Sequence, residues 1–277
     1  MGSLLPPPMV SQHGIPWLGA QDREALVLLS GMLGDATLWD GVVDGLVDLV
    51  RPWPARTDLD DSVPEMAASV LAQAPARFAV MGHSLGAIVA MEILRRAPDR
   101  VSRLVLVNAS ARGPTPAQQR AWQGWDARTA AGGFDSVVAE LAIATLAPER
   151  RGDPVLLARN EAMGFIVGPA GLRRQLSAQM TRPEGLSGLA AITVPVLVVS
   201  GDRDHICAPE LQHEIAASCR QAELVTVAGA GHMLPMEHPH DLVVALRSWL
   251  GGDGGVAGHE VTSRADHAGG PVSRGHA

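Results

Sequence analysis

Arg77-Phe78-Ala79-Val80-Met81-Gly82-His83-Ser84-Leu85-Gly86 is the stretch of the chain that decides its fold. Its first half is a short apolar run that ends at glycine, which predicts a β-strand buried on both faces. Its second half matches G-x-S-x-G, and the apolar segment 85–97 that follows predicts a helix ending before Pro98. A strand, a tight turn and a helix in this order are the context of a nucleophile elbow. Glycines two residues before and after Ser84 leave room for its strained backbone.

Four further apolar runs share the features of the run at 77–81, since each is short and is followed within two residues by Gly, Ser or Asn. They cover residues 25–29, 104–107, 196–199 and 224–227. Most of them are separated by stretches with helical patterns, among them 66–74, 85–97, 209–218 and 241–250. Such alternation predicts an α/β fold, with a mostly parallel central sheet flanked by helices.

Residues 110–190 depart from this rhythm. Four helical patterns follow one another there, at 118–129, 134–146, 154–165 and 171–180, without a convincing strand. The segment is too long for an ordinary crossover. We therefore expect an inserted helical cap between two core segments, 23–109 and 191–250. Residues 1–22 are expected to form an amino-terminal arm, and 251–277, which carry eight glycines, a disordered tail.

Acidic and basic partners for Ser84 follow the last two apolar runs. Gly201-Asp202-Arg203-Asp204 follows the run at 196–199, and Gly229-Ala230-Gly231-His232 follows the run at 224–227. The carboxyl ends of parallel strands meet at one edge of a sheet, where ligands bind. Because serine needs a base that is held by an acid, we expect Ser84 as nucleophile, His232 as base and Asp204 as acid. Asp202 stays the alternative acid.

The position after the run at 104–107 is a second place where enzymes of this kind carry their acid. It is occupied here by Asn108, an amide, which favours the later aspartates. The oxyanion needs two N–H donors, for which we expect Leu85, at the helix start, and Met32, in the loop 30–39. Trp39, Trp125 and Phe165 are candidates for the substrate pocket, although such side chains are as often core. Arginines of the cap are open candidates for binding a carboxylate: Arg128, Arg159, Arg173 and Arg174.

These segments together resemble the alpha/beta hydrolase superfamily over about residues 24–250. Within it, the chain is similar to small bacterial esterases and lactonases related to 3-oxoadipate enol-lactonase and pimeloyl-carrier-protein methyl ester esterase. The resemblance implies the nucleophile at Ser84, the acid at Asp204 and the base at His232. One departure is Ser30-Gly31, where most relatives have His-Gly. Since the donated N–H belongs to the backbone, we expect the oxyanion hole to survive this change.

Composition excludes several other kinds of chemistry. All 22 residues counted as Lys plus Arg are arginine, and the chain has no tyrosine. A lysine Schiff base and a P-loop are therefore excluded. The net charge of −7 comes without a basic block, so we expect no nucleic-acid partner. No apolar run reaches the length of a membrane span and no signal peptide is evident, which predicts a cytoplasmic protein without a membrane partner. Cys207 and Cys219 lack metal-site spacing, so no metal or other cofactor is expected.

The sequence thus predicts a serine hydrolase that cleaves a small carboxylic ester or lactone through an acyl-enzyme. The same triad can also hydrolyse a carbon–carbon bond or perform cofactor-free perhydrolysis, and these alternatives stay open. A third hypothesis is a non-catalytic binding protein with this fold. A small-molecule substrate is the expected partner, and the sequence does not decide the oligomeric state.

Overall fold

A parallel sheet of six strands forms the centre of the computed structural model, which describes residues 23–251. The arm expected at 1–22 and the tail from 252 onward lie outside the described residues. Neighbouring strands are parallel throughout, in the order β2-β1-β3-β4-β5-β6. The strands are β1 (Ala25–Leu29), β2 (Arg51–Ala55), β3 (Phe78–His83), β4 (Val101–Val107), β5 (Val196–Gly201) and β6 (Ala222–Val227). All five apolar runs are strands, which confirms the predicted α/β fold.

The strand β2 was not predicted. Its sequence, Arg51-Pro52-Trp53-Pro54-Ala55, holds two prolines, and proline removes a donor from a strand ladder. The structure tolerates them because β2 is an edge strand that pairs only with β1. Only one side of β2 is hydrogen-bonded to another strand, so the N–H group that each proline lacks need not interrupt a ladder on both sides.

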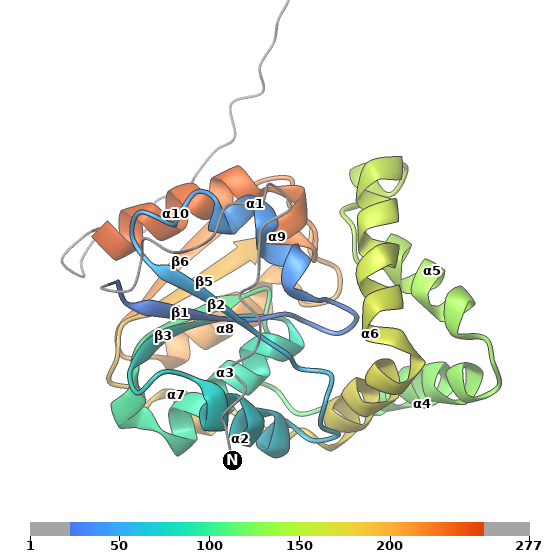
Figure 1. Ribbon diagram of the computed structural model, residues 1–277, viewed down its shortest axis with the longest axis horizontal. Helices are drawn as coiled ribbons and strands as arrows, with labels where there is room; N and C mark the ends of the chain where they lie inside the picture. Colours follow the sequence, from blue (N-terminus) through green and yellow to red (C-terminus); the bar gives the residue numbers. More distant parts are fainter. Residues whose placement is uncertain (1–22, 252–277) are drawn as a thin grey trace, which may run out of the picture.

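Helices cover both faces of the sheet (Figure 1). Alternate residues of β1 pack into two separate cores: Val27 and Leu29 into one, Leu26 and Leu28 into the other. The first core is closed by α2 (Val63–Gln73), α3 (Leu85–Arg96) and α8 (Pro209–Ser218). The second is closed by η1 (Ala36–Trp39), α1 (Asp40–Val43), α9 (Leu234–Glu237) and α10 (Pro239–Gly251). Burial on both faces explains why these strands read as unbroken apolar runs.

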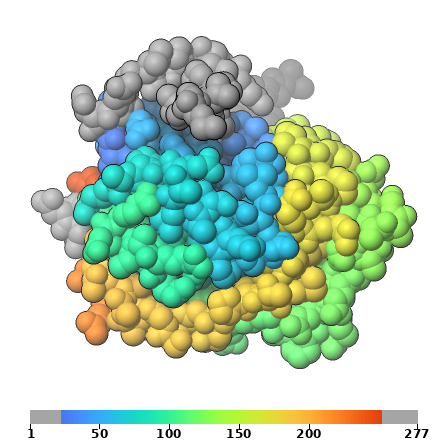
Figure 2. All heavy atoms as spheres, turned by 60° about the horizontal axis from the view of Figure 1, so that its bottom comes forward, coloured from blue at the N-terminus to red at the C-terminus, as the bar shows by residue number. Residues whose placement is uncertain are grey.

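Between β4 and β5 the chain is helical, and we call residues 110–190 the cap. Its helices have a small core of their own and lie beside the sheet (Figures 1 and 2). They are α4 (Pro116–Ala130), α5 (Phe134–Ala144), α6 (Pro154–Thr181) and α7 (Leu186–Leu189); two short 3-10 turns are η2 (Pro98–Arg100), before β4, and η3 (Pro148–Arg150), within the cap. The sequence predicted two helices where α6 runs, and α6 is kinked between them at Gly168, whose φ is 71°. No helix in the range 23–251 is long and apolar enough to cross a membrane.

Candidate active site

The turn between β3 and α3 holds Ser84 in a strained conformation, with φ 53° and ψ −117°. Neighbouring backbone leaves no space for a side chain at the flanking glycines. A Cβ at Gly82 would lie 2.3 Å from the Gly86 carbonyl oxygen, and one at Gly86 would lie 2.0 Å from the Leu29 carbonyl oxygen. The two glycines of the motif thus let the strand, the turn and the helix pack closely, with Ser84 at the carboxyl edge of the sheet.

His232 lies between Ser84 and Asp204. Its Nε2 is 3.0 Å from Ser84 Oγ, and its Nδ1 is 2.8 Å from Asp204 Oδ2. A carboxylate only accepts, so Nδ1 carries the proton and Nε2 is free to accept from the Ser84 hydroxyl. The Asp204 side chain is fully buried, and its Oδ1 accepts from the N–H groups of Ile206 and Cys207, at 2.8 and 2.9 Å. The predicted nucleophile, base and acid are therefore joined by one chain of hydrogen bonds.

Asp202, the alternative acid, has a different position. Its Oδ1 accepts from the Gly229 N–H at 2.7 Å and makes no contact with His232. It ties the loop after β5 to the loop after β6. Of the two aspartates, only Asp204 reaches the histidine.

Asn108, which follows β4, is hydrogen-bonded to the same two loops. From the sequence, we noted only that it is an amide at a position where some enzymes of this fold carry the acid. Its side chain is buried, and its backbone is left-handed, with φ 47°. Its Nδ2 donates to the carbonyls of Gly231 and His232, at 2.8 and 3.0 Å, while its Oδ1 accepts from the Gly201 N–H at 2.8 Å. One side chain thereby fixes the spacing between the acid loop and the base loop. Its place at the end of a central strand was the signal for such a role.

His83 is a second buried histidine that the sequence analysis did not single out. Its Nε2 donates to the His232 carbonyl at 2.7 Å, and the two rings lie 4.9 Å apart. Its Nδ1 is buried without a hydrogen-bond partner among the described residues. Burial, and secondly the nearby His232, lower the pKa of His83 to about 3. The ring is therefore neutral in the folded protein at neutral pH.

The buried neutral state of His83 predicts a loss of stability in acid. The unfolded chain binds a proton at this ring below its ordinary pKa of 6.5, whereas the folded chain does so only near 3. The stability that a neutral His83 contributes is thus complete above pH 6.5. It falls by roughly 1.4 kcal/mol per pH unit as the pH drops from 6.5 toward 3.

Urea unfolding at several pH values between 7.5 and 5 measures this effect. His83→Gln keeps an N–H donor but cannot titrate, and subtracting its free energy of unfolding removes the contribution of all other groups. As the pH is lowered, we expect the free energy of unfolding of the wild type to fall relative to that of the variant. Parallel curves for the two proteins would contradict a neutral buried His83.

The loop after β1 approaches Ser84 from the other side. A Cβ at Gly31 would lie 2.9 Å from His83 Nδ1 and 3.0 Å from Ser84 Cβ, so the backbone of this loop touches the elbow. Met32, the next residue, and Leu85, at the start of α3, have backbone N–H groups with no hydrogen-bond acceptor in residues 23–251. Two unpaired N–H groups on either side of a serine are what an oxyanion hole requires.

Ser30 holds this loop together through its side chain. Its hydroxyl donates to the Asp35 carbonyl at 2.7 Å and accepts from Trp39 Nε1 at 3.0 Å. These two hydrogen bonds connect the beginning of the loop to its middle and its end. Trp39, the donor of the second bond, is buried in the core that α1 and α10 close.

A cavity lies between this loop, the base loop and the cap helices α5 and α6. The residues that line it are mostly apolar and all uncharged: Met32, Leu33, Val138, Leu141, Ala142, Thr145, Asn160 and Met233. The three pocket candidates from the sequence are elsewhere. Trp39 is in the core, Trp125 Nε1 donates to Glu140 on the outside of the cap, and Phe165 is half exposed and packs edge-on against Phe134. The residues of α5 and α6 that line this cavity are therefore not the ones proposed from the sequence.

The cap arginines that were candidates for a carboxylate do not line this cavity either. Arg128 pairs with Glu140, and Arg173 pairs with Asp126, both on exposed surface. The remaining two donate to backbone carbonyls of the core, Arg159 to Thr37 and Arg174 to Asp58.

The cap is hydrogen-bonded to the base loop. The Met233 N–H donates to the Thr145 carbonyl at 3.3 Å, and the Ala147 N–H donates to Glu237 Oε2 at 2.9 Å. A Cβ at Gly231 would lie 2.2 Å from the Ala147 nitrogen, so only glycine permits this approach. Burial raises the pKa of the Glu237 carboxyl, an effect that the Ala147 N–H partly offsets. The position of His232 is thus tied to the cap as well as to the sheet.

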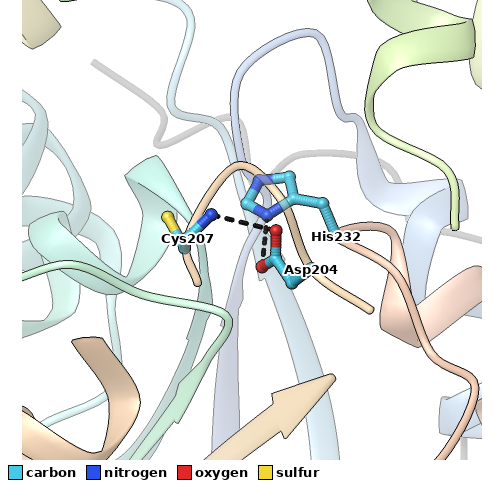
Figure 3. A group of neighbouring side chains, drawn as sticks. All are labelled: Asp204, Cys207 and His232. Carbon is cyan, nitrogen blue, oxygen red and sulfur yellow. Dashed lines mark hydrogen bonds and ion pairs between the residues drawn. The ribbon is translucent and has the colours of Figure 1, made fainter. Parts of the chain in front are cut away.

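Cys207 lies next to the acid and the base, and the three side chains include atom types that bind metals (Figure 3). The donor chemistry does not suit a metal. Both oxygens of Asp204 already accept hydrogen bonds, and burial raises the pKa of the Cys207 thiol well above its usual range. Since metals bind the thiolate, a thiol that resists deprotonation is a poor ligand. The arrangement fits a hydrogen-bonded triad with an inert cysteine beside it.

Known proteins share both the sequence and the fold. A pimeloyl-[acyl-carrier protein] methyl ester esterase from Aliivibrio salmonicida is 26% identical over 84% of this chain and 95% of its own length. Among solved structures, a hydrolase from Pseudomonas aeruginosa PA01 has a TM-score of 0.74 and 27% identity, covering 84% of this chain and 92% of its own. The enol-lactonase from Burkholderia xenovorans LB400 also has a TM-score of 0.74, at 19% identity, and covers 88% of this chain and 94% of its own. The sequence model of the alpha/beta hydrolase family matches residues 13–246, and the chain belongs to this family.

Proposed function

We propose that this chain is a serine hydrolase that cleaves a small carboxylic ester or lactone through an acyl-enzyme intermediate. The observation that carries the proposal is the hydrogen-bond chain from Ser84 through His232 to the buried Asp204. A serine in a strained turn, a base that accepts its proton and an acid that orients the base form a nucleophilic system. No cofactor is needed for this chemistry.

In the proposed mechanism, Ser84 Oγ attacks the substrate carbonyl while its proton moves to His232 Nε2. The carbonyl oxygen becomes an oxyanion, which the N–H groups of Met32 and Leu85 stabilise. Asp204 holds the imidazole in the required tautomer and stabilises its positive charge. His232 then gives its proton to the leaving alkoxide as the carbonyl forms again. Water, deprotonated by the same histidine, releases the acid and restores Ser84.

The ester bond as target is supported by a relative that is similar over most of both chains and is named a methyl ester esterase. An uncharged portion of the substrate is supported by the cavity beside Met32 and Met233, which is lined by uncharged residues and walled by cap helices. In this proposal residues 110–190 cover the substrate, and the core carries out the chemistry.

A fluorophosphonate probe tests the activated serine directly. We expect the folded wild-type protein to take up one label per chain, on the peptide that contains Ser84, and to hydrolyse short p-nitrophenyl esters. Preincubation with the probe should remove that hydrolysis in proportion to labelling. A folded protein that neither labels nor hydrolyses any ester would contradict the proposal and favour a binding protein. Labelling with turnover only of an activated diketone, or only with peroxide present, would replace ester hydrolysis by the alternative chemistry.

A further inference from the structure

An unpaired hydrogen-bond acceptor lies in the wall of the otherwise apolar cavity. Asn160 reaches it from α6 and is 7% exposed. Its Nδ2 donates to the Ala142 carbonyl at 3.1 Å and to Thr145 Oγ1 at 3.0 Å. A backbone carbonyl can only accept, so this partner fixes which end of the amide is nitrogen. The other end, Oδ1, accepts no hydrogen bond from any residue in the described range, and it is not one of the fully buried unpaired atoms, so it is open to the cavity.

The neighbouring hydroxyl cannot supply the missing donor. Thr145 Oγ1 donates its proton to the Leu141 carbonyl at 2.8 Å and accepts from Asn160. Both protons of the Asn160 amide and the proton of Thr145 are therefore already used. The polar corner of the cavity offers a bound molecule an acceptor and no donor. A donor on the substrate would replace water as the partner of this acceptor.

The lack of charged residues in the cavity wall limits which group of the substrate can donate a hydrogen bond to Asn160. None of the residues that line the cavity is ionisable, and the nearby cap arginines Arg128 and Arg173 are paired on the outer surface. A substrate carboxylate would face Asn160 Oδ1 without a positive partner. An ammonium group would lose its hydration without gaining a counter-charge. A hydroxyl meets neither penalty.

We propose that the cavity selects esters whose bound portion is uncharged and carries a hydroxyl group, with Asn160 Oδ1 accepting its proton. The proposal rests on the function proposed above and names the substrate class of that same site. Asn160 is the residue that determines this specificity, and apolar side chains such as Leu141 and Met233 surround the rest of the substrate.

Matched methyl esters test the proposal, with acid release followed in a pH-stat. The pairs are butanoate with 3-hydroxybutanoate and hexanoate with 6-hydroxyhexanoate, together with monomethyl succinate as the charged analogue. In the wild type we expect at least one hydroxylated ester to exceed its parent in kcat/KM by about 2- to 10-fold, the range of a typical net hydrogen bond. Monomethyl succinate should be the poorest substrate.

Two variants locate the preference. Asn160→Leu removes the acceptor, and we expect it to bring the ratio of hydroxylated to parent ester to about 1. Thr145→Val removes the hydroxyl that Asn160 donates to but leaves Oδ1, and should retain the wild-type ratio. Because the ratio is taken within one protein, it does not depend on the folded fraction.

Equal kcat/KM for every matched pair in the wild type, an unchanged ratio in Asn160→Leu or a preference for the succinate ester would overturn the proposal. Each of these outcomes leaves ester hydrolysis at Ser84 intact. If no ester is hydrolysed and no fluorophosphonate label is taken up, the proposed function itself fails.

Discussion

Replacing Ser84 by alanine is expected to lower kcat for ester hydrolysis by about 10⁴- to 10⁶-fold, because the proposed acyl-enzyme forms on the hydroxyl group of this serine. Serine and alanine meet the same strain at the observed φ of 53°, so the fold should be retained. The alternatives for covalent chemistry are few, since the chain has no lysine or tyrosine and the buried Cys207 resists deprotonation. Steady-state rates on short methyl esters, with circular dichroism to confirm folding, measure the loss.

The double variant Ser84→Ala/His232→Ala provides a sharp control. If the two residues act as one unit, removing His232 after Ser84 should cost almost nothing further. A Ser84→Ala protein with turnover within tenfold of wild type would show that hydrolysis occurs elsewhere. Additive losses in the double variant would mean that His232 serves a separate role.

Local sequence was sufficient to predict those elements of the structure that depend mainly on residues close together in the chain. Short apolar runs that are followed by Gly, Ser or Asn predicted five of the strands, and the glycine spacing around Ser84 predicted the elbow. The strand β2 escaped because Pro52 and Pro54 argue against a strand unless it lies at an edge. Being at an edge is a property of the whole sheet, which no local pattern shows.

Contacts between distant segments explain what the sequence did not show at the site. Asn108 is more than a hundred residues from the carbonyls of Gly231 and His232 that it holds, and His83 is as far from His232. Trp39 and Phe165, which were chosen for size and type, do not line the cavity beside Met32 and Met233. Asn160 and Phe165 lie on different sides of the same half of α6, and which side faces the core depends on packing, so that Asn160 lines the cavity and Phe165 does not.

Asp204→Asn is expected to lower kcat by about 10³- to 10⁴-fold while leaving the shape of the site unchanged. The new Oδ1 can still accept hydrogen bonds from the N–H groups of Ile206 and Cys207. The new amide nitrogen then faces His232 Nδ1 and donates to it. The proton of the imidazole moves to Nε2, where it blocks transfer from Ser84. The loss should therefore appear in kcat, with little change in KM.

Asp202→Asn is the matched control, because it makes the same chemical change two residues away. Its Oδ1 can still accept from the Gly229 N–H, and it does not touch His232. We expect kcat within about threefold of wild type, since a neutral acceptor replaces a charged one at an exposed bond. Both variants are compared by kcat on one methyl ester at equal concentrations of folded protein. Equal losses in the two would mean that the aspartates only order their loop, whereas a loss confined to Asp204→Asn requires the carboxylate that lies 2.8 Å from the imidazole.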